Sequence, residues 1–569
     1  MSPELARLIS VAKGAEPADL VLTNARVVNT FTGEVESGNV AVCGDRVAGV
    51  GDYREAKEVI DLGGRYLAPG LINGHTHLES SMLDVEQYAR AVVPHGTAAI
   101  ITDLHEIANV AGMAGIRYVM DYARRLPFAL FLMAPSCVPA THLETSGATV
   151  TPEDIKIMLR WKECLGLGEV MNFPGVLFGD EVMLGKIDIA AGKVKDGHAP
   201  GVRGKDLAAY IAAGIGSDHE SVTLAEAEEK LRQGMYVMIR EGSSEKNLEA
   251  LLPLVTDKTC KRTFFVVDDR SAADLLHDGD IDAVVRKAIR LGLDPVRAIQ
   301  MATINTAEYF RLDDLGAIAP GRFANMIVVD DLEKLTISRV FYRGRLVAEE
   351  GKSLFGFKEP PAGRIRNTVN IKPFSVESLK IKAKNATMPV IEVVPGQIIT
   401  RRREEKVIVS EGFVTSDTER DILKLVVLER HKATGNIGLG LVHGFGLKQG
   451  ALASSIAHDS HNIVAVGVSE EDIYTAVREI ERLQGGLVVV EAGRVVASLG
   501  LPIAGLLANE SLEMVVSKLE KLEELARKMG AKLDAPFATL SFLALPVIPE
   551  LRLTDLGLVD VNQFKLIDN

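Results

Sequence analysis

Short apolar runs alternate with helical stretches between residues 68 and about 310, and this alternation limits the possible folds more than any other feature of the chain. About eight strands and their helices in about 240 residues match the size and period of a (β/α)₈ barrel. One helix start is explicit, because Thr151-Pro-Glu-Asp offers a cap, a first-turn proline and two acids. The alternation therefore predicts an α/β fold built on a TIM-like barrel. The apolar runs lie at 66–72, 98–103, 128–135, 168–171, 193–198, 211–215, 236–240 and 263–269.

The segments on both sides of the barrel have the pattern of β structure. Residues 1–67 are predicted to form an N-terminal helix followed by short strands, and strand signals return over 313–352. We therefore expect a small β-sandwich into which the barrel, residues 68–312, is inserted. A linker rich in Lys, Pro and Gly is expected at 353–385, and residues 386–569 mix strand and helix patterns as a C-terminal α+β domain.

The composition is that of a soluble globular protein. Of the 569 residues, 47% are hydrophobic and 25% are charged, which provides ample apolar material for a large core. The net charge of −13 argues against nucleic acid or an anionic membrane as the main partner. The four cysteines form no CxxC pair, which is typical of free thiols in a reducing cytosol. Because a signal-peptide layout and an apolar run of membrane-spanning length are both missing, we expect a cytoplasmic location without membrane contact.

Histidines and carboxylates stand at one predicted strand end after another. In a (β/α)₈ barrel the carboxyl ends of the strands face a common pocket, so residues far apart in sequence converge there. Each residue alone has an ordinary explanation, such as a helix cap at Glu169, a turn at His198 or a surface ion pair at Asp268. Their joint placement in one fold predicts a metal site. In chain order the strand-end residues are His75, His77, Asp103, His105, Glu169, His198, His219, Asp268 and Asp269.

The ligand types indicate the chemistry of such a site. Imidazole and carboxylate without thiolate suit zinc, manganese or iron(II). Glu169 is expected to bridge two ions, one held by His75 and His77 and the other by His198 and His219. Two cations sharing one oxygen acidify a bound water, and Asp268 is placed to take its proton and deliver it to a leaving group. These residues predict a hydrolase that adds water to an electrophilic carbon and expels an amine or an alcohol.

Several runs resemble a known family. The segments Pro69-Gly-Leu-Ile-Asn-Gly-His-Thr-His and Gly316-Ala-Ile-Ala-Pro-Gly-Arg-Phe-Ala-Asn-Met-Ile-Val-Val resemble the amidohydrolase superfamily of metal-dependent hydrolases. Within it, other runs resemble the microbial adenine deaminases, and this resemblance covers nearly the whole chain. They are Asp103-Leu-His-Glu-Ile-Ala-Asn, Pro135-Ser-Cys-Val-Pro-Ala-Thr, Gly168-Glu-Val-Met-Asn-Phe-Pro-Gly-Val, Asp196-Gly-His-Ala-Pro-Gly, Ser217-Asp-His-Glu, Ile239-Arg-Glu-Gly-Ser and Ser454-Ser-Ile-Ala-His-Asp-Ser-His-Asn.

The resemblance implies conversion of adenine to hypoxanthine and ammonia at a binuclear iron or manganese centre, and zinc stays possible on the ligand types alone. It implies a small-molecule substrate and a homo-oligomer, a dimer or larger. The pattern leaves open which of Asp268 and Asp269 faces the metal, because neighbouring strand residues point to opposite faces; we take Asp268. The implied metal ligands are His75, His77, Glu169 (bridging), His198, His219 and Asp268, and the implied catalytic residues are Asp268, Glu169 and His219.

Two further groups have more than one interpretation. Asp103, His105 and Glu106 follow the second strand, where contact with substrate or support of a metal ligand competes with a structural role. His458 and His461 are spaced i, i+3 and would form another metal site if helical. They would otherwise cover the pocket from the C-terminal domain or serve structure alone.

Two other functions compete with deamination of adenine. A cyclic-amide hydrolase of the hydantoinase or dihydroorotase type usually bridges its metals with a carboxylated lysine at the fourth strand, and the Glu169 found there counts against it. A catalytically inactive scaffold with the amidohydrolase fold is expected to lose one or more ligands, and here the full set is present.

Overall fold

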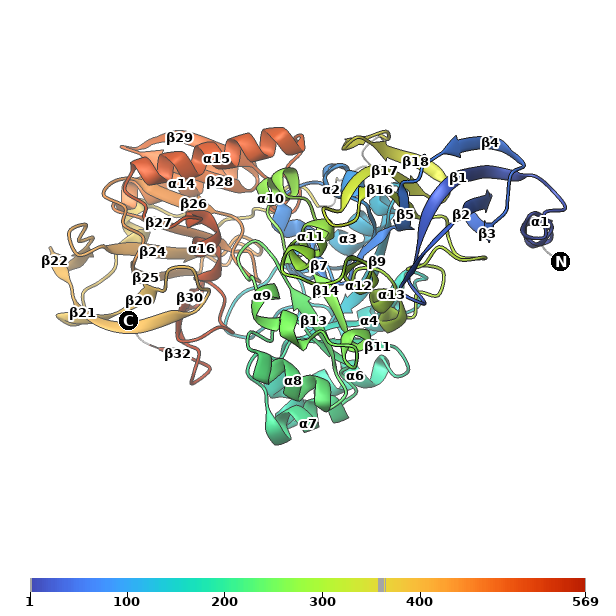
Figure 1. Ribbon diagram of the computed structural model, residues 1–569. Helices are drawn as coiled ribbons and strands as arrows, with labels where there is room; N and C mark the ends of the chain where they lie inside the picture. The colour runs from blue at the N-terminus through green and yellow to red at the C-terminus, as the bar shows by residue number, and fades with distance from the viewer. Residues whose placement is uncertain (1–2, 357–362, 364, 568–569) are drawn as a thin grey trace.

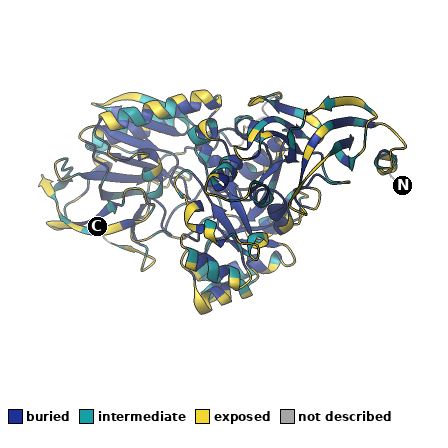
Figure 2. Ribbon diagram, in the orientation of Figure 1, coloured by how far each residue is buried: buried dark blue, intermediate teal, exposed yellow. Residues whose placement is uncertain are grey.

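A computed structural model describes residues 3–356, 363 and 365–567. A sheet that contains the N-terminal strands lies at one end of the molecule, the barrel lies in the middle, and a sheet-rich C-terminal region lies at the other end (Figure 1). The strands of the barrel are largely buried, whereas strands at the outer ends of the other two parts are partly exposed, and the outer helices expose one face (Figure 2).

The end sheet is built from two segments that are far apart in sequence. It has nine strands in the order β19-β18-β17-β16-β5-β1-β2-β3, with β4 paired to β1. Strand β5 joins the halves, because it pairs in parallel with β1 and antiparallel with β16. The barrel is thus inserted between the two segments. The bounds are α1 Pro3–Ala12, β1 Ala18–Asn29, β2 Glu34–Cys43, β3 Arg46–Gly51, β4 Ala56–Asp61, β5 Tyr66–Pro69, β16 Met326–Asp331, β17 Thr336–Tyr342, β18 Arg345–Glu349 and β19 Lys352–Ser353.

Parallel strands between these segments form the barrel. The order β6-β8-β9-β10-β11 continues through a backbone hydrogen bond from Gly216 N–H to the Lys195 carbonyl (3.0 Å) into β12-β13-β14. Strand β15, just after β14, pairs in parallel with β7, just after β6, and closes the ring. The bounds are β6 Leu71–Asn73, β7 Thr76–His77, β8 Thr97–Thr102, β9 Ala129–Pro135, β10 Cys164–Val170, β11 Val194–Gly197, β12 Ser217–Asp218, β13 Tyr236–Arg240, β14 Thr263–Val266 and β15 Asp268–Asp269.

Helices follow the barrel strands. The expected cap at Thr151 is confirmed, since its hydroxyl accepts from Asp154 N–H and the Asp154 carboxylate accepts in return from Thr151 N–H. The bounds are α2 Val85–Val92, α3 His105–Ala123, α4 Pro152–Met158, α5 Phe173–Phe178, α6 Glu181–Ile189, α7 Gly204–Ala212, α8 Leu224–Arg232, α9 Leu248–Leu251, α10 Ala272–His277, α11 Ile281–Arg290, α12 Pro295–Met301 and α13 Ile304–Phe310.

The sixth barrel strand does not lie where the sequence predicts it. Residues 211–215 are the end of α7 and the turn that follows, and β12 begins only at Ser217. The alanines of this run favour a helix, and Gly214, with φ of +93°, ends it in a conformation that side chains disfavour. The prediction of a strand at 211–215 is therefore wrong.

The C-terminal region contains an eight-stranded sheet in the order β21-β20-β25-β24-β27-β26-β28-β29. Part of the expected linker, 357–362 and 364, lies outside the described residues. No helix among the described residues has the length and apolar character needed to span a bilayer. The bounds are β20 Thr387–Val393, β21 Thr400–Lys406, β22 Ile408–Ser410, β23 Phe413–Thr415, β24 Ile422–Leu428, β25 Ile437–His443, β26 Ala451–Ser454, β27 Ile463–Gly467, α14 Glu470–Leu483, β28 Gly486–Glu491, β29 Arg494–Gly500, α15 Leu512–Lys528, α16 Pro536–Phe542, β30 Leu551–Thr554, β31 Gly557–Asp560 and β32 Lys565–Ile567.

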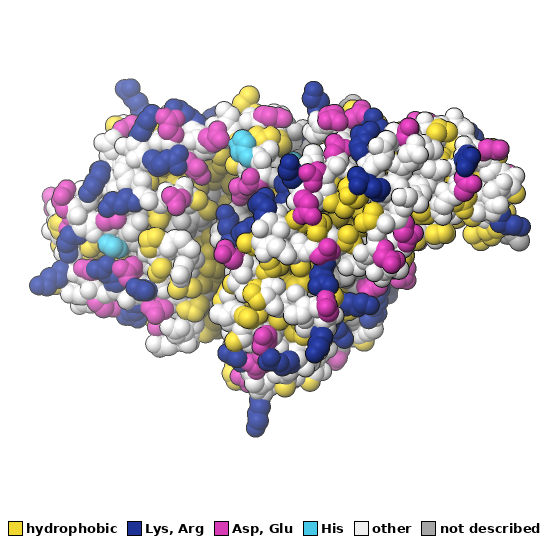
Figure 3. All heavy atoms as spheres, viewed as in Figure 1, with side chains coloured by type: hydrophobic (Ala, Val, Ile, Leu, Met, Phe, Trp, Pro, Cys, Tyr) yellow, Lys and Arg dark blue, Asp and Glu magenta, His cyan; other side chains and the backbone are white. Residues whose placement is uncertain are grey.

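The C-terminal region packs directly on the barrel. A continuous buried cluster includes Ile107 of the barrel and Ile456 of the C-terminal region. Polar contacts add to it, among them the hydrogen bond from Ala508 N–H to the Met82 carbonyl (2.8 Å). On the visible face, Lys and Arg side chains are interspersed with Asp and Glu (Figure 3).

Candidate metal centre

Four histidines and two carboxylates meet at the carboxyl ends of the barrel strands. His75 lies between β6 and β7, and His77 ends β7. Glu169 stands near the end of β10, His198 directly follows β11, and His219 directly follows β12. Asp268 begins β15, which is paired with β7. Because all these strands run in parallel, their ends share one edge of the barrel, as the sequence predicts.

Glu169 lies at the centre of the group. Its Oε1 is 3.0 Å from His75 Nε2 and 2.9 Å from His77 Nε2. Its Oε2 is 3.1 Å from His198 Nδ1 and 3.9 Å from His219 Nε2. Each carboxylate oxygen thus faces one pair of imidazoles, which is the arrangement expected of a ligand shared by two cations.

Asp268 faces the same imidazoles as Glu169. Its Oδ1 is 3.4 Å from His75 Nε2 and 3.1 Å from His77 Nε2, and its Oδ2 accepts a hydrogen bond from Arg240 (2.7 Å). Asp268 has a φ of +60°, an uncommon conformation for a residue with a side chain. The neighbouring Asp269 instead accepts from the hydroxyl of Ser80. The geometry therefore distinguishes the two aspartates, which the sequence pattern does not.

The unsatisfied polar atoms of this group suit a divalent cation. His75 Nε2 and Glu169 Oε1 are buried and make no hydrogen bond within the described structure, although they face one another. Buried polar atoms are normally paired by hydrogen bonds. A nitrogen and an oxygen that converge without such a bond are the kind of ligand atoms that a metal site requires. Although burial disfavours a charged ring, Glu169 and Asp268 raise the pKa of His75 to about 10, so the cage favours positive charge.

Both carboxylates are ionised at neutral pH. Burial alone would raise the pKa of Glu169, but the imidazoles of His75, His198 and His77 outweigh it and hold this pKa well below the usual range. Burial would likewise raise the pKa of Asp268. His75, His77 and Arg240 outweigh this effect, so the pKa of Asp268 is also well below the usual range. Metal binding therefore requires no proton loss from either carboxylate.

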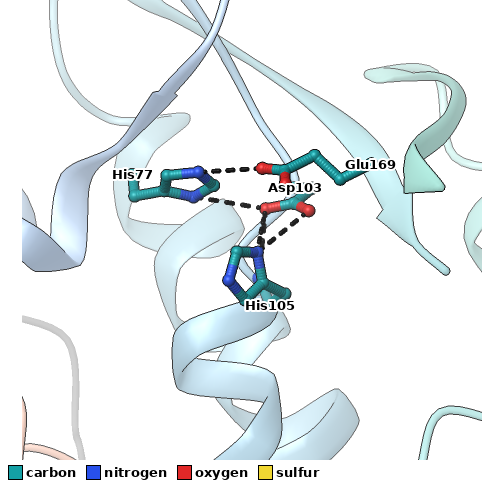
Figure 4. Close-up of side chains that lie close together, drawn as sticks. All are labelled: His77, Asp103, His105 and Glu169. Atoms are coloured by element: carbon teal, nitrogen blue, oxygen red, sulfur yellow. Dashed lines mark hydrogen bonds and ion pairs between the residues drawn. The ribbon is translucent and has the colours of Figure 1, made fainter. Parts of the chain in front are cut away.

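A second chain of contacts leads away from His77 (Figure 4). Its Nδ1 lies 3.4 Å from Asp103 Oδ1, at ion-pair distance. The same oxygen lies 2.9 Å from His105 Nδ1, and His105 Nε2 lies 3.3 Å from Glu106 Oε1. All four residues are buried. Asp103, His105 and Glu106 thus contact one another behind a candidate metal ligand.

His458 and His461 are brought to the barrel mouth by the C-terminal region. They lie in the turn between β26 and β27, so the helical spacing that would have made them a metal pair does not occur. His458 Nδ1 is 2.7 Å from Glu106 Oε1, and His461 Nε2 contacts Glu106 Oε2. Both histidines therefore meet a residue of the barrel that lies about 350 positions earlier in the chain.

Glu220 and Arg240 belong to the site and were not among the predicted ligands. Arg240 donates to both oxygens of Glu220 and to Asp268, and Glu220 Oε1 lies 3.3 Å from His219 Nε2. The hydrogen bond from Arg240 fixes the Oδ2 atom of Asp268. One signal in the sequence could have revealed Glu220, because it directly follows His219 at a strand end.

Lys230 holds the segments that carry His198 and His219. It is fully buried and donates to Asp218 (2.9 Å), to Glu226 (2.7 Å) and to the Ala199 carbonyl (2.8 Å). Asp218 in turn accepts from Ala199 N–H (3.0 Å).

Replacement of Lys230 by Ala should therefore lower the free energy of unfolding by about 3–5 kcal/mol, because it leaves buried carboxylates without their cation. Chemical denaturation would measure the change, with the exposed Lys205→Ala on α7 as the control. Equal stability of the two variants would contradict this role.

A closed barrel whose strand ends gather four histidines and two carboxylates defines a metal-dependent hydrolase of the amidohydrolase type. The amidohydrolase family model matches residues 66–347, and the model of the adenine deaminase C-terminal domain matches residues 397–565. A protein of Dehalococcoides mccartyi named adenine deaminase is 63% identical over 567 residues, which cover 100% of this chain and 99% of that protein. Adenine deaminase 2 of Carboxydothermus hydrogenoformans is 52% identical over 98% of both chains. The chain belongs to the adenine deaminase family.

Proposed function

We propose that this protein hydrolyses adenine to hypoxanthine and ammonia. The observation that carries the proposal is full-length similarity to proteins named adenine deaminase, combined with a complete set of candidate ligands at the strand ends. The cyclic-amide hydrolase is less well supported, because Glu169 occupies the centre of the group in place of a carboxylated lysine. An inactive scaffold is disfavoured by the same complete set.

Two divalent cations would be held by this chain. His75 and His77 would bind one and His198 and His219 the other, with Glu169 shared between them and Asp268 as a further ligand. Manganese or iron(II) is proposed from the family resemblance, and zinc also suits these ligands. Bound cations supply Lewis acidity that makes water a nucleophile near neutral pH.

Proton transfer and the orientation of the site would be carried out by side chains of the protein. Asp268 is an ionised carboxylate, so it can accept a proton from the attacking water and pass it to the departing amino group. Arg240 holds the second oxygen of Asp268 and keeps the carboxylate oriented. His219 is buried, with its Nε2 3.9 Å from Glu169 and 3.3 Å from Glu220, and it would act through the cation that it holds with His198.

Asp103, His105 and Glu106 are proposed to support the site from behind His77. Metal-bound histidines commonly direct their other ring nitrogen to a carboxylate, which fixes the ring and increases its basicity. Asp103 occupies this position relative to His77 Nδ1. The homo-oligomer, the cytoplasmic location and the domain boundaries stay predictions.

Metal-depleted protein should release ammonia from adenine only after manganese or iron(II) is restored. Two equivalents of metal should be required, because Glu169 faces two separate pairs of imidazoles. Ammonia release from adenine, from other purines and from hydantoin would be measured side by side as metal is added. Hydantoin hydrolysis without adenine deamination would favour the cyclic-amide hydrolase, and inactivity toward all substrates at full metal content would favour the scaffold.

A further inference from the structure

The contacts between the barrel and the C-terminal region include a buried cluster of one carboxylate and two histidines. Glu106 belongs to the first turn of α3, and His458 and His461 belong to the turn between β26 and β27. Glu106 is 2% exposed and His461 is 1% exposed. Burying a carboxylate lowers the stability of a protein unless hydrogen bonds or ion pairs compensate the charge. The pairing of Glu106 in this cluster therefore calls for a functional explanation.

The hydrogen-bond pattern fixes the proton on His461. Its Nδ1 accepts from Ala457 N–H (3.3 Å), so in a neutral ring the proton resides on Nε2, the atom that contacts Glu106 Oε2. Burial lowers the pKa of His461 to about 4, which keeps the ring neutral at pH 7. His461 therefore presents a hydrogen-bond donor to Glu106.

His458 complements this contact from the other side. Its Nδ1 donates to the other oxygen of Glu106 (2.7 Å). Each oxygen of Glu106 is thus held by one histidine of the C-terminal region. Oε1 of Glu106 also lies 3.3 Å from His105 Nε2.

We propose that the C-terminal region acts on the metal centre as a positioning element, through a relay of buried side chains that ends on the ring of His77. The proposal rests on the proposed metal centre. The relay runs from His461 and His458 through Glu106, His105 and Asp103 to His77.

Each contact of the relay restricts the next side chain. The paired histidines fix Glu106, which limits rotation of His105, and His105 orients Asp103. Asp103 faces Nδ1 of His77 and leaves Nε2 directed at Glu169. Loss of a partner behind a metal-bound histidine typically weakens metal binding about 10- to 100-fold. A partner several contacts away should therefore act near the lower end of that range.

Glu106, His458 and His461 could instead form a cation site of their own, and the test must distinguish such a site from the relay. One donor atom each from Glu106, His458 and His461 lies within 4.8 Å of the others, a spacing that can hold a cation. The proton assigned to His461 Nε2 argues against this, because a metal ligand must present a lone pair.

The test compares His461→Ala with His461→Gln in the full chain, because the glutamine amide can donate at the place of Nε2. Manganese affinity would be measured by competition with a chelator, and bound metal by elemental analysis. We expect His461→Ala to bind manganese about tenfold more weakly and His461→Gln to regain most of the loss. Glu106→Gln should weaken binding similarly and serves as a second probe if His461→Ala does not fold. His443→Ala, in β25 outside the cluster, is the matched control.

The outcomes separate this proposal from the proposed function. Unchanged manganese affinity in His461→Ala and Glu106→Gln would overturn the relay. A fall from three bound equivalents to two in both His461 variants would also overturn it, because the cluster would then be a cation site. If the unmodified protein binds manganese but releases no ammonia from adenine, the proposed substrate fails and the relay remains testable.

Discussion

Glu169→Gln should reduce ammonia release from adenine by at least about 10³-fold, a loss within the range of groups that act on charge in the reaction. The two oxygens of Glu169 together face all four histidines of the centre. The amide retains the shape of the side chain, but its nitrogen cannot act as a ligand and the negative charge is lost. Turnover under saturating adenine and manganese, together with bound metal per chain, would measure the effect.

A matched control lies near the other end of the same strand. Glu163 directly precedes β10 and forms a surface ion pair with Arg124 (2.9 Å). Glu163→Gln should leave turnover unchanged, whereas Glu169→Gln should remain folded with a similar unfolding midpoint. Turnover of Glu169→Gln within threefold of the unmodified protein would remove this residue from the mechanism.

Asp268→Asn should lower turnover by roughly 10²–10⁴-fold, the contribution typical of a positioned general acid or base. Its carboxylate faces His75 and His77 and is oriented by Arg240, so the substitution removes a proton acceptor while the hydrogen bond acceptor to Arg240 remains. The loss should appear in kcat more than in KM, because binding of adenine does not need this proton transfer.

The neighbouring Asp269 is the natural comparison for Asp268. Asp269 is the next residue in the chain. It accepts a hydrogen bond from the Ser80 hydroxyl, whereas Asp268 faces the two histidines. Asp269→Asn should therefore retain turnover within about tenfold, a far smaller effect than general acid or base loss produces. If the two substitutions had equal effects, or if Asp269→Asn were the more damaging, the assignment of the proton acceptor to Asp268 would be wrong.

The local patterns of the chain predict most of the barrel and the grouping of histidines and carboxylates at one of its edges. Alternating strand and helix periodicity depends on neighbours in sequence, so the sequence alone predicts the runs that end near His75, Asp103 and Glu169. Parallel strands then force those ends to one edge, which is why distant imidazoles could be grouped in advance. The strand predicted at 211–215 is wrong because helix and strand preferences are hard to separate in a short alanine-rich run.

Tertiary structure alone decided how the edge is completed. Which of Asp268 and Asp269 faces the histidines depends on the local backbone, where Asp268 has a positive φ. The contact of Arg240 with Glu220 joins the ends of two different strands. The meeting of His458 with Glu106 spans 352 positions of sequence. Such contacts depend on how separately folded segments pack against one another, and periodicity carries no information about that packing. The sequence by itself therefore determined the fold and the kinds of side chain at the strand ends, whereas packing decided which other side chains support them.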